Sequence, residues 1–206
     1  MRAVHVDEYA AAVERAGATY GMSLHWGKTQ AMSVGAAGSL KRPDGSYFED
    51  CSSLQYLGAL LTCDGRVDSE LSRKLGLARA DFRQLCQLWS HSNVSLKDKI
   101  KFFNALILSK LRYGLATIWL TTAQRRRLDG FAARCLRVIL RIPASFVSRI
   151  SNAEVLRRAA SKPFSQQVLK HQLCLLRRAA LAEDGHPLRK DTFTNTVLVP
   201  QIGCFI

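Results

Sequence analysis

Residues 121–142 read TTAQRRRLDGFAARCLRVILRI, and this stretch decides the fold class. The spacing of Thr121 and Gln124 is that of a capping box, which predicts that a helix begins here. At 3.6 residues per turn, its apolar side chains fall on one side of that helix. These side chains are Leu128, Phe131, Cys135, Val138, Ile139 and Ile142. The sequence therefore predicts a long amphipathic helix over 121–142, of the kind that packs in a helical bundle.

Arginines occupy the other side of the predicted helix, within about a third of its circumference. They are Arg126, Arg127, Arg134, Arg137 and Arg141. Like charges in a row weaken a helix unless something neutralises them, and guanidinium groups pair with phosphate oxygens in a fork geometry. We therefore interpret the stripe as a nucleic-acid-binding surface. A solvated face and a contact with an acidic protein are the alternatives.

The preceding segment shows the same helical period. Apolar residues recur every three or four positions from Val67 to Trp89, which predicts one amphipathic helix there. Its basic side chains lie off the apolar stripe and could extend the charged track. They are Arg66, Arg73, Arg79 and Arg83.

Several further helices are expected in the rest of the chain. Ser95 with Asp98 and Ser151 with Glu154 resemble capping boxes, and Pro163 suits a first helical turn. The stretch 102–120 is strongly apolar, but it holds Lys110 and Arg112 near its middle. Because each central charge costs about 2.5–3.5 kcal/mol in a bilayer, a buried central helix is favoured over a membrane span.

The first sixty residues have a different pattern. They predict a helix over 7–20 and short strands over 22–26, 31–34 and 54–61. A hairpin is expected about Pro43-Asp44-Gly45, Lys28 falls in a turn between strands, and Tyr56-Leu57-Gly58 falls within the last strand.

The expected fold class is α+β and mostly α: a small antiparallel sheet with one helix, followed by a basic helical bundle. The expected domains are 1–62, a helix with antiparallel strands; 63–142, a helical bundle; 143–184, additional helices; and 185–206, a tail.

Basic residues are concentrated after residue 60. The chain of 206 residues has a formal net charge of +14. Residues 1–60 contain five Lys and Arg against six Asp and Glu, whereas 61–206 contain the other 25 basic and ten acidic residues. A field of this sign attracts polyanions, of which nucleic acid is the commonest.

The sequence predicts neither a catalytic centre nor a bound metal or cofactor. It contains no adjacent Asp-Asp pair, no G-x-S-x-G and no H-E-x-x-H. His171 and Cys174 have the spacing of half a metal site, but no second half lies nearby. The six cysteines are scattered and form no C-x-x-C pair, and no secretory signal is recognisable, so an intracellular location, nucleus or cytoplasm, is expected.

Taken in order, the motifs resemble the reverse transcriptases of LINE-type (non-LTR) retrotransposons, from about residue 7 to about residue 181. The resemblance begins with YGMSLHWGKTQAM at 20–32 and LQYLG at 54–58. It continues with DGRVD at 64–68, Lys97, FFNALILSKLRYG at 102–114 and Trp119. It ends with RRLD at 126–129, RCLR at 134–137 and SNAEVLRR at 151–158.

The resemblance implies a right-hand polymerase, in which the end of a palm sheet precedes a helical thumb that clamps template and primer. Lys28 would be an accessory catalytic lysine, and Tyr56, Leu57 and Gly58 would hold the primer end. The thumb arginines would follow the duplex backbone. The partners implied are RNA, DNA or their hybrid, together with the fingers and the rest of the palm.

This sequence departs from the family pattern, because the paired catalytic aspartates expected before residue 7 are absent. The complete family enzyme would use Mg²⁺, which needs such carboxylates. The expectation is thus a C-terminal fragment of a transposable-element polymerase that is inactive alone. The alternatives are a non-enzymatic basic helical module that binds nucleic acid or an acidic protein, and a pseudogene product without a selected function.

Overall fold

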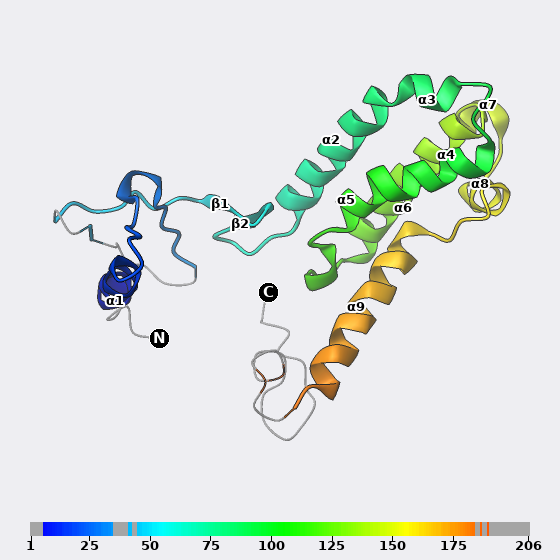
Figure 1. Cartoon of the computed structure of the whole chain (residues 1–206). Coiled ribbons are helices and arrows are strands. Elements are labelled where there is room, and N and C mark those ends of the chain that lie inside the picture. The colour runs from blue at the N-terminus through cyan, green and yellow to red at the C-terminus, as the bar shows by residue number, and fades with distance from the viewer. Residues whose placement is uncertain (1–5, 35–40, 43–44, 184–185, 187–188, 190–206) are drawn as a thin grey trace. The chain divides into compact units, whose positions relative to one another are not determined.

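The structure is a computed structural model that describes residues 6–34, 41–42, 45–183, 186 and 189. It is mostly α-helical with a small two-stranded antiparallel sheet, which confirms the expected α+β, mostly α class (Figure 1). The chain divides into two compact units, residues 1–66 and 67–206, which are described separately. The predicted tail, 185–206, lies outside the described residues except for His186 and Arg189.

The first unit begins with α1 (Val6–Ala18), which confirms the predicted helix, and a short 3₁₀ turn, η1 (Trp26–Lys28), follows. The strands predicted over 22–26 and 31–34 are wrong. Residue 31 forms only an isolated parallel bridge with Asp50, and Met22 and Val34 remain exposed. Their alternating pattern therefore has no buried face to define a strand.

At the hairpin expected about Pro43, Lys41 and Tyr47 form an antiparallel bridge, and the N–H of Arg42 donates to the backbone oxygen of Ser46 at 2.7 Å. Residues 43 and 44 themselves lie outside the described residues.

The single strand predicted over 54–61 is instead a hairpin of β1 (Ser53–Tyr56) and β2 (Ala59–Thr62). Leu57 has a φ of 47° and Gly58 a φ of 81°, so both residues are left-handed. Two such residues form the tight turn whose twist suits antiparallel strands. The prediction that Tyr56-Leu57-Gly58 lies in a strand is thus corrected: Tyr56 ends β1, and Leu57 and Gly58 are the turn.

The second unit contains the remaining helices. They are α2 (Asp68–Gln84), α3 (Cys86–Ser90), α4 (Leu96–Phe102), η2 (Phe103–Leu108), α5 (Ser109–Arg112), η3 (Leu115–Thr117), α6 (Thr122–Ile139), α7 (Ser145–Ser148), α8 (Asn152–Arg158) and α9 (Phe164–Leu181). α4, the π-helical turn η2 and α5 follow one another without a break.

Three of the predicted helices end earlier than expected. The segment 67–89 breaks at Leu85 and gives α2 and α3. The apolar stretch 102–120 stops being one helix after Arg112, because Gly114 has a φ of 78° and redirects the chain. α6 ends at Ile139, and Arg141 lies beyond it with a φ of 56°.

The helix starts confirm the capping signals. The hydroxyls of Ser95 and Ser151 accept hydrogen bonds from backbone N–H groups at 3.1 and 3.2 Å, and Thr121 with Gln124 forms the complete capping box. α9 is capped differently, because Asp129 of α6 accepts hydrogen bonds from the backbone N–H and the hydroxyl of Ser165 at 2.8 and 2.7 Å. This long-range cap fixes the start of α9 against α6.

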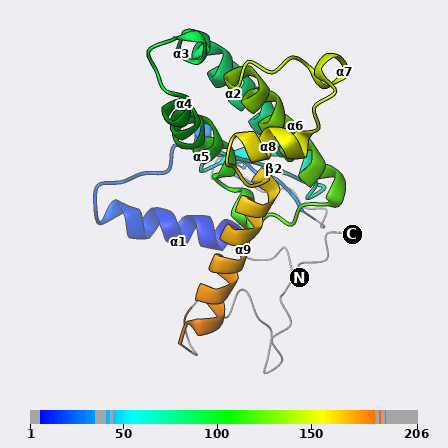
Figure 2. The same ribbon diagram turned by 90° about the vertical axis from the view of Figure 1, so that its right-hand side faces the viewer.

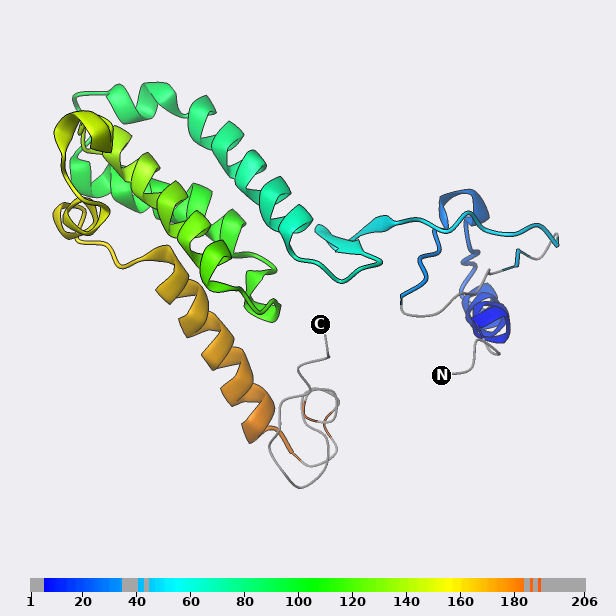
Figure 3. The ribbon, with the colours of Figure 1, turned by 180° about the vertical axis from the view of Figure 1, so that it is seen from behind.

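α6 is the central helix of the second unit and contacts α2, α3, α4, α8 and α9. Views from opposite sides show α2, α6 and the α4–α5 segment side by side (Figures 1 and 3). A turned view shows α8 against α6 (Figure 2). Large core side chains come from α2, η2, α6, α8 and α9: Leu71, Leu75, Phe103, Ile107, Leu128, Phe131, Val155, Phe164 and Val168.

Candidate nucleic-acid interface

α2 and α6 lie beside each other and run in the same direction. Near their first residues, Gln124 Nε2 donates to Asp68 Oδ1 at 3.1 Å. Beyond their last residues, Arg141 Nη2 donates to the backbone oxygen of Ser90 at 2.9 Å. Because early residues meet early residues and late residues meet late ones, the adjoining sides of the two helices lie beside each other along their length.

Five of the predicted arginines are exposed on this pair of helices, and Arg127 is one of them. The other four are Arg79, Arg83, Arg126 and Arg134. Within the part of the chain that the structure describes, no side chain or carbonyl accepts a hydrogen bond from them, and no carboxylate pairs with them. Their guanidinium groups therefore keep their full capacity for an external anion. We call these four residues the arginine surface.

Arg79 of α2 and Arg134 of α6 both act electrostatically on the same buried thiol, that of Cys135. Burial raises the pKa of Cys135 to about 12, and the positive charges of Arg134 and Arg79 oppose that rise. Two cations from different helices thus act at one point. The thiol is protonated at neutral pH and contributes no charge of its own.

The acidic side chains of α2 do not neutralise these arginines, because other cations use them. Glu70 pairs with Arg73 and Lys74, and Asp81 Oδ2 lies 2.9 Å from Lys110 Nζ. The third, Asp68, pairs with Arg127 Nη1 at 3.4 Å. The arginine surface therefore keeps its positive charge.

Three other predicted arginines are already partly or fully engaged. Arg127 contacts Asp68 and donates to Ser72 Oγ at 2.9 Å, with its side chain 45% exposed. Arg141 is exposed but donates to Ser90. Arg73 forms a two-bond fork with Glu70 at 2.8 and 3.0 Å, which raises the pKa of Arg73. Arg73 thus forms an ion pair within α2, while Arg127 lies in the first half of α6 and Arg141 lies just after its end.

The prediction that Arg137 shares the exposed face is wrong. Arg137 is only 5% exposed, and its Nη2 donates to the backbone oxygen of Ile150 at 2.6 Å and to Asn152 Oδ1 at 3.0 Å. The chain after α6 folds back over this part of the helix and uses the guanidinium to hold the start of α8. Periodicity within one helix cannot show that a later segment covers its polar side.

The other predicted site residues belong to the first unit. Lys28 is exposed at the end of η1. Tyr56 and Leu57 are exposed at the hairpin, and Gly58 is the second turn residue. These residues lie at the hairpin and in the 3₁₀ turn. Their positions do not form a catalytic arrangement.

The described residues offer no metal centre. No group of three His, Cys, Asp or Glu side chains among them is arranged to hold an ion. The Mg²⁺ implied for the complete family enzyme therefore has no carboxylate cluster in this part of the chain. His171 Nε2 instead lies 2.9 Å from Arg112 Nη1. As for the membrane, no helix that the structure describes is both long and apolar enough to span one.

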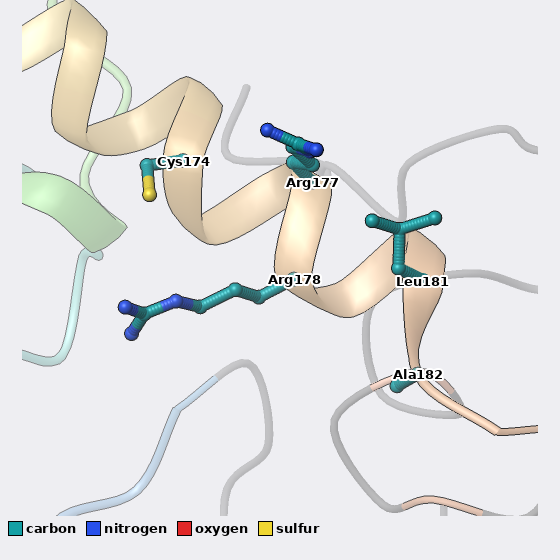
Figure 4. A pocket seen from close by; sticks show the side chains of 5 residues that line it. All are labelled: Cys174, Arg177, Arg178, Leu181 and Ala182. Atoms are coloured by element: carbon teal, nitrogen blue, oxygen red, sulfur yellow. The ribbon is translucent and has the colours of Figure 1, made fainter.

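A hollow of about 410 Å³ lies along the end of α9 (Figure 4). Its described lining comes from α9 and the residue after it: Cys174, Arg177, Arg178, Leu181 and Ala182. The side chains of Arg177 and Arg178 point to different sides of the helix in Figure 4. Two guanidinium groups that point apart cannot both bind one small anion, so we assign no site here.

Sequence reasoning missed one member of the basic region, Arg125, whose guanidinium lies 5.4 Å from the ring centre of Trp119. The position of Arg125 in the first turn of the helix, close in sequence to a tryptophan, is the signal that could have shown this pair.

In comparisons with known proteins, no family model, no curated protein and no solved structure matches the chain.

Proposed function

We propose that the second unit binds the phosphate backbone of nucleic acid through the arginine surface on α2 and α6. The observation that supports the proposal is a difference in ion pairing between the acidic side chains of α2 and the arginines of the arginine surface. Every acidic side chain of α2 is paired with another cation, whereas Arg79, Arg83, Arg126 and Arg134 have no acceptor among the described residues. Unneutralised guanidinium groups on a rigid helical scaffold are the usual means of contacting phosphates.

The proposal agrees with the motif order that resembles LINE-type reverse transcriptases, where the thumb follows the template–primer duplex. We propose that this chain corresponds to the end of the palm and the thumb of such an enzyme. Because the sequence holds no adjacent Asp-Asp pair, the chain supplied with primer, template and nucleotides is expected to incorporate none.

The direct test is charge reversal of three of the four residues, Arg79→Glu, Arg83→Glu and Arg134→Glu, in one variant. A duplex of RNA and DNA should bind the wild-type chain and lose at least about tenfold in affinity with the variant, since each charge-assisted phosphate contact contributes about 1–3 kcal/mol. Fluorescence anisotropy with a labelled duplex measures both affinities.

A matched control reverses three exposed lysines on other elements: Lys97, Lys162 and Lys170. It makes the same change in net charge, so a general field effect would weaken binding equally in both variants. Equal losses, or no loss in the arginine variant, would contradict the proposal. Loss of an acidic protein partner with unchanged nucleic-acid affinity would favour the protein-binding alternative.

A further inference from the structure

The side chain of Trp119 is exposed to solvent, whereas that of Trp89 is buried. Trp89 is 3% exposed, and its indole N–H donates to the backbone oxygen of Phe82 at 2.8 Å. Trp119 is 65% exposed, between η3 and α6. An indole buries a large apolar area when it packs. An indole that is this exposed therefore indicates a surface that another molecule could cover.

The backbone around Trp119 is fixed on both sides. Leu120 is 2% exposed and anchors the segment in the core. The backbone oxygen of Ile118 accepts a hydrogen bond from Gln172 Nε2 at 2.6 Å, and the N–H of Thr121 donates to Gln124 Oε1 at 2.9 Å. The indole is therefore held outward by its neighbours, so a ligand would find the ring already ordered.

Positive charge adjoins the indole. The guanidinium of Arg125 lies 5.4 Å from the ring centre, a cation–π distance. Arg126 and Arg127 follow directly in the sequence, and the first turn of α6 holds no acidic residue. With a guanidinium over one face and the residue 65% exposed, most of the remaining indole surface is open to solvent.

We propose that Trp119, backed by Arg125, is a stacking site for one unpaired base of single-stranded nucleic acid, an inference that rests on the phosphate binding proposed above. Every base has a π-face that can stack on an aromatic ring, whatever its sequence. A phosphate beside that base would meet the positive charge of Arg125 itself and of the exposed Arg126 that follows it. A blunt duplex keeps its bases stacked on one another, so the site favours ends, gaps and single strands.

The test compares two single strands of about 12 nucleotides, a size suited to one small binding surface. One is an oligodeoxyadenylate, and the other is an abasic strand with the same phosphates. The wild-type chain should bind the strand that carries bases about tenfold more tightly, toward the lower end of what one stacked base contributes. Trp119→Ala should abolish this preference and leave affinity for the abasic strand unchanged, whereas Trp119→Phe should retain part of it.

Phe146→Ala is the matched control, since Phe146 is an aromatic residue that is 85% exposed on α7. This variant should keep the full preference for bases. Circular dichroism should show all variants folded, because both altered rings are exposed. Equal binding of the two strands by the wild-type chain, or a preference that survives Trp119→Ala, would overturn the stacking site and leave phosphate binding intact. No binding of either strand would overturn both proposals.

Discussion

The two units of this chain differ in how they use their apolar side chains. Among the described residues of the first unit, Phe48 is the one large apolar side chain that is buried, while Tyr9, Tyr20 and Leu57 are more than two-thirds exposed. The second unit buries a continuous core drawn from eight of its helical segments: α2, α3, η2, α5, η3, α6, α8 and α9. The described residues of the first unit form hydrogen bonds but no extended apolar core, and a two-stranded hairpin alone is only marginally stable. We infer that the folding free energy resides in the helical unit.

The largest expected difference concerns hydrogen exchange. Amides of the second unit's core, such as those of Phe131 and Ile107, should be protected about a thousandfold or more beyond the hairpin amides of Leu54 and Leu61, because core amides exchange only through global opening of about 5 kcal/mol or more. Exchange followed by mass spectrometry of peptides measures both regions. Stronger protection in the hairpin than in α6 would reverse the comparison.

The next effect separates two adjacent phenylalanines. Phe103 is fully buried and Phe102 is 42% exposed. Phe103→Ala should lower the free energy of unfolding by about 3–5 kcal/mol, because it removes a large core side chain and leaves a cavity. Phe102→Ala should cost much less, and Phe48→Ala should leave the main helical transition unmoved. Urea unfolding followed by circular dichroism tests all three, and an equal cost for Phe102 and Phe103 would break the account of the core.

Local signals predicted much of this fold. The starts at Ser95, Thr121 and Ser151 were predictable because a cap involves residues only a turn apart. The cap of α9 was not, because Asp129 comes from another helix. The turn at Leu57-Gly58 was also missed, since a leucine rarely adopts a positive φ and the apolar run about it reads as one strand.

A smaller effect distinguishes two arginines one turn apart on α6. Arg137→Ala should destabilise the second unit by about 2–3 kcal/mol, because it removes a buried guanidinium and the charged hydrogen bonds that it donates to the oxygens of Ile150 and Asn152. Arg134→Ala should change stability by less than about 0.5 kcal/mol, as exposed surface substitutions do, and weaken nucleic-acid binding instead. Thermal unfolding measures the stability of each variant, and fluorescence anisotropy measures its affinity for nucleic acid. Equal destabilisation by the two variants would contradict it.

The same pair shows why the site was only partly predictable. The helical period placed both arginines opposite the apolar face, and Arg134 is indeed exposed. The fate of Arg137 depends on residues 143–152, which fold back over α6, and periodicity carries no information about such a return. That Arg79 and Arg83 have no carboxylate partner among the described residues likewise depends on which cations pair with Asp68, Glu70 and Asp81.

The smallest effect is a pH dependence within α8. Hydrogen bonds from Arg157 and Arg158 lower the pKa of Glu154 to about 2, from an ordinary value of 4.5. A carboxyl group whose pKa is lower in the folded state stabilises the fold above its unfolded pKa, and this stabilisation is lost as the pH falls from about 4.5 toward 2. Glu154→Gln should therefore make the acid side of the stability curve slightly shallower in urea unfolding at several pH values.

Glu183→Gln makes the same charge change on an exposed glutamate and is the control for net charge. The proposed effect of the two arginines on Glu154 would be contradicted by either of two results. One is a steeper fall in stability at low pH in Glu154→Gln, and the other is the same change in both variants.

The most direct measurement of the central claim is the salt dependence of duplex DNA binding by the wild-type chain and by Arg79→Gln/Arg83→Gln/Arg134→Gln. Each phosphate contact contributes about 0.9 to the slope of log affinity against log salt between about 50 and 200 mM. If these three arginines contact phosphates, the slope of the variant should be lower in magnitude by about 2–3. A wild-type affinity that salt does not change, or a variant slope equal to that of the wild type, would contradict the account.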